Sequence, residues 1–178
     1  MRFHLGWGGD LRAAADGATQ RPATARGSEL RGSSNGLQRE RHVVEIDGDA
    51  WAAARDELLA FRWFPPELLR AEVAADGATV MQRVRLGPVS VDAPVRIVER
   101  EESERRVALT VVTVSGHPER GVERYQLVLD PALHRVTLTV EKAWTLADPL
   151  ARLARPFATW LQAHATRRSL RRFADRRW

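Results

Sequence analysis

The segment SGHPERGVERYQL, residues 115–127, gathers side chains that can move protons or bind polar groups. His117 and Glu119 are two residues apart, so an imidazole and a carboxyl can act together as general acid and base. Glu123 follows on the same segment, and Arg120 adds a fixed positive charge. A plain hairpin needs only a turn residue or two, so this segment has more chemistry than a connection requires.

Three interpretations of this segment are open. In the first, His117 and Glu119 satisfy backbone donors and acceptors and hold a bent connection in one shape. In the second, the segment gates the mouth of a cavity, where His117 and Arg120 touch the polar end of a ligand. In the third, His117 is a general acid or base assisted by Glu119 or Glu123. Because no cofactor motif is visible, that chemistry would be a cyclisation, hydration or isomerisation.

The backbone of the segment is equally constrained. Gly116 and Gly121 permit a positive φ at its two ends. Pro118 fixes one φ and biases His117 away from helix. We therefore expect a bent connection between two strands.

The sequence argues against metal and cofactor chemistry. The chain has no cysteine, which excludes disulfides, thiolate metal sites and cysteine nucleophiles. The His-x-Glu spacing of zinc deaminases needs two downstream cysteines, the H-E-x-x-H pattern is absent, and the five histidines are scattered. The run GSSNG at residues 32–36 matches a nucleophile pattern, but no hydrophobic strand precedes it. We expect no metal, no cofactor and no serine nucleophile.

Length and charge favour one folded domain. The 178 residues can bury a sizeable core, and no apolar run is long enough to span a bilayer or to form a secretory signal. We therefore expect a cytoplasmic protein. The net charge is +5, and every basic side chain except Lys142 is an arginine.

The first residues differ in composition from the rest. Residues 1–40 are rich in glycine, alanine, serine and arginine and have few large apolar side chains. Such a composition favours loop or disorder, so we expect little regular structure there. Phe3, Leu5 and Trp7 could dock onto the domain that follows.

The folded domain, residues 41–173, is predicted to combine helices with an antiparallel sheet. A short strand at 42–46 precedes a helix at 51–61, and the prolines at positions 65 and 66 can open a second short helix. The apolar period then changes to two, which predicts five strands in an antiparallel meander. A long C-terminal helix follows Asp148 and Pro149.

One face of that long helix is apolar. At about 100° per residue, six side chains fall within roughly 60° of one direction: Leu150, Leu153, Phe157, Trp160, Leu161 and His164. This stripe can lie in the concave side of a curved sheet, and Pro156 should kink the helix. The order of elements predicts an α+β helix-grip fold with about six strands, two short helices and a long C-terminal helix. A cavity between helix and sheet is expected by analogy.

Polar residues that share strand parity with apolar neighbours are candidates for the cavity wall. Gln82 is in phase with Val84 and Glu99 with Ile97, although Glu99 can equally stand at a strand end in water. A satisfied core histidine is the alternative to a ligand contact at position 164. The candidates for ligand binding are Gln82, Glu99, His117, Arg120, Tyr125, Trp144, Trp160 and His164, and those for catalysis are His117, Glu119 and Glu123.

The C-terminal segment, residues 166–178, is basic. Beyond residue 165 arginines take the core-facing positions, and Leu170 and Phe173 point to the opposite side, so we expect the helix to project past the domain. Its arginines form either a solvated face or a surface for anionic lipid or an acidic partner. The residues concerned are Arg167, Arg168, Arg171 and Arg172. Nucleic acid is a weaker candidate, because no reader motif is present.

The run G-H-P-E-R-G between two strands resembles the signature of an uncharacterised family, domain of unknown function DUF1990, over about residues 42–172. Further matching stretches are Leu86-Gly87-Pro88-Val89, Val95-Arg96-Ile97-Val98 and Arg152-Leu153-Ala154-Arg155-Pro156. The chain departs from the family pattern at Thr113-Val114-Ser115, at Val122 and at Ala143-Trp144-Thr145-Leu146. The resemblance implies the helix-grip superfamily of START and plant-allergen-like proteins, which includes lipid carriers and polyketide cyclases. It implies no established catalytic residues.

These observations lead to one main hypothesis and two alternatives. We expect a helix-grip domain that binds a small apolar or amphipathic molecule between the sheet and the C-terminal helix, without metal or nucleotide. The first alternative is a cofactor-independent cyclase or isomerase that uses His117 and Glu119. The second is an interaction or membrane-surface protein that uses the basic C-terminal segment.

Overall fold

The computed structural model describes residues 3–6, 8–30, 36–147 and 155–178. Its strands are β1 (Phe3–Leu5), β2 (Gln38–Asp47), β3 (Leu69–Val73), β4 (Thr79–Leu86), β5 (Val89–Glu102), β6 (Arg106–Thr113), β7 (Glu119–Asp130) and β8 (Arg135–Leu146). Its helices are α1 (Leu11–Asp16), α2 (Trp51–Leu59) and α4 (Arg155–Asp175), with 3-10 turns η1 (Gly27–Leu30) and η2 (Gly48–Ala50). The α+β class predicted from the sequence is confirmed.

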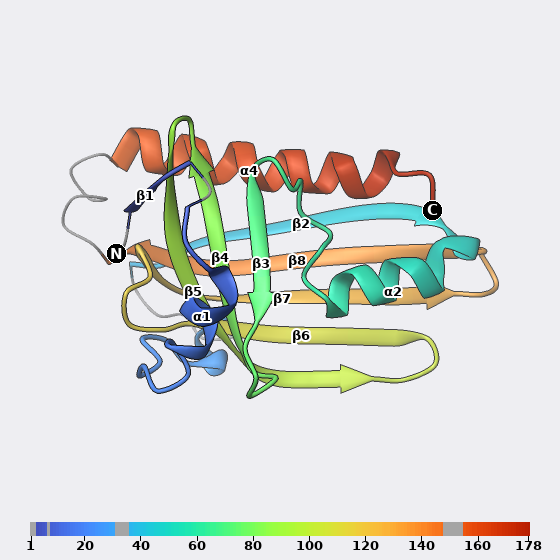
Figure 1. The fold of residues 1–178 in the computed structure, drawn as a ribbon. Helices are drawn as coiled ribbons and strands as arrows, with labels where there is room; N and C mark the ends of the chain where they lie inside the picture. The colour runs from blue at the N-terminus through green and yellow to red at the C-terminus, as the bar shows by residue number, and fades with distance from the viewer. Residues whose placement is uncertain (1–2, 7, 31–35, 148–154) are drawn as a thin grey trace.

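The eight strands of these described residues form one antiparallel sheet, in the order β2-β8-β7-β6-β5-β4-β3 with β1 beside β5. The long strand β5 pairs with β4 through its first half and with β6 through its second half. A bulge between Ile97 and Glu99 lies near this change of partner, and bulges bend a strand and increase its twist. Figure 1 shows β3, β4 and the start of β5 running across the direction of β6, β7, β8 and β2. The sheet is therefore strongly curved.

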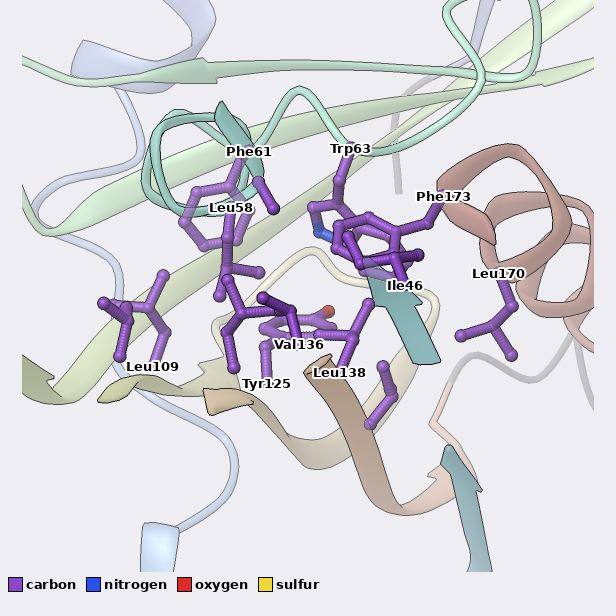
Figure 2. Close-up of a cluster of buried hydrophobic side chains, with 14 of the residues drawn as sticks. Ile46, Leu58, Phe61, Trp63, Leu109, Tyr125, Val136, Leu138, Leu170 and Phe173 are labelled. Carbon is purple, nitrogen blue, oxygen red and sulfur yellow. The ribbon is translucent and has the colours of Figure 1, made fainter. Parts of the chain in front are cut away.

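The curved sheet grips α4, which lies along β2 and β8 in Figure 1. Side chains from α2 and from the last turns of α4 pack together on the inner face of the sheet (Figure 2). The buried cluster includes Ile46, Leu58, Phe61, Trp63, Leu109, Tyr125, Val136, Leu138, Leu170 and Phe173. Each fully buried side chain of this size contributes about 1.5–3 kcal/mol. The helix-grip fold predicted from the sequence is thus confirmed, with a core that fills one end of the concave face.

The N-terminal segment covers the opposite, convex face of the sheet. Ala15 and Ala18 are fully buried against Met81 of β4, and Ala25 packs on Val112 of β6. Arg83, on the same face, donates to the carbonyl oxygens of residues 8 and 9 at 2.5 and 3.0 Å. The segment from residue 3 to 30, expected to be mostly loop, therefore has a strand, a helix and a 3-10 turn in the structure. Its small alanines allow close packing, which a count of large apolar residues overlooks.

The second short helix expected after Pro65 and Pro66 is wrong. The carbonyl oxygen of Pro65 accepts hydrogen bonds from the amides of Leu68 and Leu69, which closes a single turn. The chain then enters β3, where Leu69 pairs with Val84 of β4. Pairing with a strand edge satisfies the backbone of this segment, and β3 together with β1 raises the number of strands from about six to eight.

The end of α4 is docked on the domain, so the expectation that it projects is also wrong. Leu170 and Phe173 are buried in the core, and the Trp178 ring lies against the Phe173 ring with 4.8 Å between centroids. Arg176 pairs with Glu57 of α2 at 2.6 Å. No helix in the described part of the chain is both long and apolar enough to cross a membrane.

The orientation of α4 also differs from the predicted one. Trp160, on the predicted inward stripe, is 55% exposed, whereas Thr166 and Ser169 are buried. The predicted positions 148–154, including the expected helix start and the stripe residues Leu150 and Leu153, lie outside the described residues. Beside the pocket the inward face is polar, because there it meets charged side chains of the sheet, and buried charges need hydrogen-bond partners.

Candidate functional site

A pocket of about 390 Å³ lies between the concave face of the sheet and α4. Pockets for small molecules in proteins hold roughly 300–1,000 Å³, so this volume suits a compact ligand. Most of the wall is hydrocarbon and includes Phe64, Leu68, Val91, Val95, Val111 and Trp144. One wall is polar and consists of Gln82, His117, Glu119, Glu123, Tyr125, Lys142, Gln162 and Thr166.

Strands β7 and β8 position most of the polar wall. In their antiparallel register Glu123 is opposite Lys142, and Gly121 is opposite Trp144. Because side chains alternate along a strand, residues 119, 121, 123 and 125 all face the pocket. Opposite charges directly across two strands attract each other, so the register itself forms the ion pair.

The two glycines of the G-H-P-E-R-G run have different roles. Gly116 has a φ of +96°, the left-handed conformation that was expected there. Gly121 lies in the strand without a positive φ, contrary to expectation. A Cβ at this position would lie 2.7 Å from the Ala143 carbonyl oxygen and 2.8 Å from Cβ of Trp144. Glycine therefore lets β7 and β8 approach closely beneath the pocket.

A fixed ion pair lies at the centre of the polar wall. Lys142 Nζ is 3.2 Å from Glu123 Oε1 and donates to Thr166 Oγ1 of α4 at 3.0 Å. The Tyr125 hydroxyl donates to Glu123 Oε2. Burial would raise the pKa of Glu123, but the Lys142 charge and these hydrogen bonds outweigh it and hold the pKa below its usual value. Glu123 is a carboxylate at neutral pH.

Tyr125 is a phenol over the whole physiological range. Burial, and then the negative charge of Glu123, raise the pKa of Tyr125 well above its ordinary value of 10.0. Its hydroxyl also hydrogen-bonds the side chain of Gln82. The phenol thus connects β4 to the ion pair on β7 and β8.

His117 is a neutral imidazole. Burial lowers the pKa of His117 to about 4, even though the nearby Glu123 charge opposes that shift. The ring atom Nδ1 lies 2.9 Å from the amide nitrogen of Glu119, whose N–H donates to it. Nδ1 also lies 3.1 Å from the carbonyl oxygen of Glu119, so this ring atom is held between the amide and the carbonyl of one residue. His117 is therefore a clasp for the backbone at the pocket wall.

Glu119 is an acid that titrates near neutral pH. Burial raises the pKa of Glu119 to about 7, although the Gln162 amide of α4 donates to its carboxylate and opposes the shift. The remaining amide atom, Gln162 Oε1, is buried without a hydrogen-bond partner among the described residues. The pocket thus has one exchangeable proton and one unused acceptor at the same place.

The pKa values along this wall are pushed far apart, which is typical of groups that share acid and base roles. At neutral pH Glu123 is ionised, Glu119 is near the midpoint of its titration, and His117 and Tyr125 are uncharged. The wall can hold the polar end of a ligand while the hydrocarbon surface holds the remainder. It can also give or take one proton through Glu119.

Six of the residues predicted for the site line the pocket: Gln82, His117, Glu119, Glu123, Tyr125 and Trp144. Arg120 points to the opposite face, where it pairs with Glu29 of η1 at 2.5 Å, because alternate residues of a strand face opposite sides. Trp160 and His164 stack on each other on α4, with ring centroids 5.2 Å apart. None of these last three residues is among the described residues of the wall.

Glu99 also lies on the opposite face, where it accepts a hydrogen bond from Thr110 at 2.9 Å. The β5 bulge inserts one extra residue, so Ile97 pairs with Val111 while Glu99 pairs with Thr110. The bulge reverses the parity that the sequence predicted for Glu99.

Three residues of the polar wall were missed. Lys142 had a signal, because it is the single lysine and is in phase with Val140 and Trp144. Gln162 and Thr166 had none, since their role depends on which face of α4 meets the sheet. No residue was predicted as a metal ligand. The structure does group Asp47, Asp49 and His134 at the exposed far end of β2 and β8.

Residues 19–172 match the family described as Domain of unknown function (DUF1990). Among solved structures, the XoxI protein of Bacillus cereus is similar with a TM-score of 0.55 and 10% identity, over 77% of this chain and 93% of that chain. An uncharacterised protein of Bacillus thuringiensis has a TM-score of 0.51 and 9% identity, over 76% and 98% of the two chains. No protein of curated function matches the sequence.

A plant structure shows a weaker likeness. Norcoclaurine synthase of Thalictrum flavum, in complex with dopamine and hydroxybenzaldehyde, has a TM-score of 0.48 and 11% identity, over 75% of this chain and 84% of that chain. At identities this low, the likenesses concern the fold alone.

Proposed function

The chain belongs to the DUF1990 family, and from that premise we propose that it binds a small amphipathic molecule in the pocket between the sheet and α4. The observation that carries this proposal is a space of about 390 Å³ whose hydrocarbon walls meet one polar wall. A concave, mostly apolar pocket with a few polar groups on one side is the usual form of a small-molecule site.

The polar wall indicates which end group the ligand has. Gln162 Oε1 is a buried acceptor without a partner in the described residues, and the Glu123 carboxylate is an acceptor as well. A buried acceptor left unpaired costs about 1–3 kcal/mol, which a ligand donor would recover. We therefore expect a ligand with an apolar body and a hydroxyl, amide or amine hydrogen at one end.

A variant whose pocket is occupied by a larger side chain tests this proposal. Ala165 of α4 lines the pocket, and Ala165→Trp should occupy the space; Ala174→Trp places the same side chain on the exposed side of the same helix. Titration with the fluorescent probe N-phenyl-1-naphthylamine should show binding to the native protein and to the Ala174 variant, and at least tenfold weaker binding to the Ala165 variant. Equal binding by all three proteins would place the probe outside the pocket and refute the proposal.

Native mass spectrometry then identifies the natural ligand. The protein is purified from its own host, weighed with anything it retains, and extracted. A defined co-purifying molecule that is absent from Ala165→Trp is the expected result. A ligand that remains bound to that variant would contradict binding in this pocket.

A second candidate function is acid–base catalysis in the same pocket. The observation that favours it is the carboxyl of Glu119, with a pKa of about 7, on the same pocket wall as the neutral imidazole of His117. A group that titrates near the working pH is the most effective general acid or base. Such a site suits a cofactor-independent isomerisation or cyclisation.

Deuterium exchange separates a catalyst from a binder. The extracted molecule is incubated with the protein in deuterium oxide, and carbon-bound deuterium is measured by mass spectrometry. A catalyst incorporates deuterium, and Glu119→Gln should stop incorporation while retaining the ligand. Retention of the ligand by the native protein without any exchange would leave binding as the function and exclude proton transfer at carbon.

A further inference from the structure

Positive charge is concentrated in the last 24 residues of the chain. Residues 155–178 include seven arginines and one aspartate, a net charge of +6, whereas the whole chain has +5. The other 154 residues therefore have a net charge of −1. A charge distribution this uneven draws an anionic partner toward one side of the molecule.

Much of this charge lies on the outer face of α4. At about 100° per residue, Trp160, His164, Arg167 and Arg171 fall in a stripe roughly 60° wide, and Arg168 borders it. Arg167, Arg168 and Arg171 are exposed, whereas Leu170 and Phe173 of the same helix are buried. Arg168 pairs with Glu67 at 2.7 Å. Arg167 and Arg171 have no acidic partner among the described residues.

The same stripe has an aromatic end. Trp160 is 55% exposed, and its ring stacks on His164 with an interplanar angle of 22°. Exposed indoles are enriched where a protein meets the headgroup region of a bilayer, and arginines nearby pair with lipid phosphates. A helix with basic and aromatic residues on its outer face can therefore lie on a membrane surface.

We propose that the outer face of α4, formed by Trp160, His164, Arg167, Arg168 and Arg171, docks on a bilayer that contains anionic lipid. The position of the pocket favours lipid over nucleic acid as the partner. The opposite face of α4 is a wall of the apolar pocket, and Phe3, which also lines the pocket, is 56% exposed. An apolar pocket directly behind the docking helix suits a lipid surface better than it suits nucleic acid. The docking itself does not depend on the pocket being occupied.

Vesicle binding tests the docking surface with the full chain. Sedimentation should show binding to vesicles of phosphatidylcholine with phosphatidylserine, weaker binding at high salt, and little binding to phosphatidylcholine alone. The double variant Arg167→Glu/Arg171→Glu should bind at least about 30-fold more weakly, since each basic side chain near an anionic surface contributes about a factor of five. Trp160→Ala should weaken binding without changing its dependence on salt.

A matched control changes the same net charge elsewhere. Arg26 and Arg105 are exposed and distant in sequence from α4, so Arg26→Glu/Arg105→Glu should retain most of the vesicle binding. Equal loss in both double variants would mean that overall charge, not this face, drives association, and would overturn the proposal. So would absence of binding to anionic vesicles, or binding of a DNA duplex in place of vesicles. Circular dichroism of each variant excludes unfolding as the cause.

Discussion

Two of the ion pairs that bridge neighbouring strands of the sheet lie on opposite faces of it. On the convex face Arg83 of β4 is opposite Asp92 of β5, and on the concave face Glu123 of β7 is opposite Lys142 of β8. The first pair is closed: the two side chains are 2% and 4% exposed. The second pair is open to the pocket, where Lys142 and Glu123 are 11% and 24% exposed.

The partners of the two pairs differ in kind. Arg83 donates twice to the Asp92 carboxylate, at 2.7 and 3.2 Å, and its remaining nitrogen donates to backbone carbonyls of the N-terminal segment. Lys142 and Glu123 instead take partners from side chains that line the pocket. A closed pair of this kind attaches one segment to the sheet, whereas an open pair leaves groups that a ligand can reach. The comparison therefore separates a structural charge pair from a functional one.

Neutralising the closed pair should have the largest effect on stability. Asp92→Asn keeps the shape of the side chain but leaves the Arg83 charge buried without its counter-charge, which costs about 3–5 kcal/mol. The N-terminal segment should loosen at the same time, because Arg83 holds its backbone. Urea unfolding measures the loss, and limited proteolysis detects cleavage before residue 30.

A surface pair provides the control for this prediction. Asp56, with 69% side-chain exposure, lies 3.6 Å from Arg55, and Asp56→Asn should change stability by less than about 0.5 kcal/mol. If Asp92→Asn is no more destabilising than this control, the convex pair is not a structural attachment and the comparison fails.

A side chain added at Gly121, beneath the open pair, should have the next largest effect on stability. Gly121→Ala puts a Cβ 2.7 Å from a carbonyl oxygen of β8, so the strands must separate locally at a cost of about 1–3 kcal/mol. Trp144 lies beside this position and lines the pocket, so probe binding should weaken as well. Gly27→Ala is the control, because its nearest atom would be 3.5 Å away. Similar stability of the two variants would show that β7 and β8 can adjust freely.

The alternation of side chains along a strand could be read from the sequence only where the strand runs without a bulge. Glu123 and Trp144 could be assigned to the inner face, since β7 and β8 pair without interruption. Glu99 could not, because a single extra residue in β5 reverses its face, and no turn residue or glycine marks that bulge. The convex ion pair was not predicted, since an alternating strand pattern favours solvent for both Arg83 and Asp92.

The helix that closes the pocket was predicted as an element but with the wrong face inward. Its apolar residues alone favour burying the stripe of Trp160 and His164. In the structure the opposite face is inward, where Gln162 meets Glu119 and Thr166 meets Lys142. Those partners are on distant strands, so the helix pattern by itself contains no information about them. The basic end of the helix was misplaced for the same reason.

The free energy of unfolding should depend on pH through two buried groups of the pocket, Glu119 and His117. The pKa of Glu119 rises from 4.5 to about 7 on folding, so its contribution is present below pH 4.5 and is lost as pH rises to 7. The pKa of His117 falls from 6.5 to about 4, so its contribution is lost as pH falls through that range. The two effects oppose each other between pH 4.5 and 6.5.

Glu119→Gln should therefore remove the decline toward neutral pH and leave only the rise due to His117. Relative to the native protein, the variant should gain about 1–2 kcal/mol between pH 4.5 and pH 7.5, less than the full shift implies because water reaches the pocket. Urea unfolding at a series of pH values measures this difference. Parallel profiles for the two proteins would mean that Glu119 keeps an ordinary pKa in the folded state.

Neutralising the open pair should have the smallest effect on stability and a clear effect on binding. Glu123→Gln keeps an acceptor for the Tyr125 hydroxyl, and Lys142 retains Thr166 and gains water from the pocket, so the loss should be about 1 kcal/mol. Ligand affinity should fall at least tenfold, because the wall changes from a neutral ion pair to a net positive charge. Urea unfolding beside Asp92→Asn and titration of the extracted ligand give the two numbers. The contradicting result is an equal loss of stability in Asp92→Asn and Glu123→Gln, together with normal ligand binding by Glu123→Gln. In that case exposure to the pocket does not distinguish a functional ion pair from a structural one in this sheet.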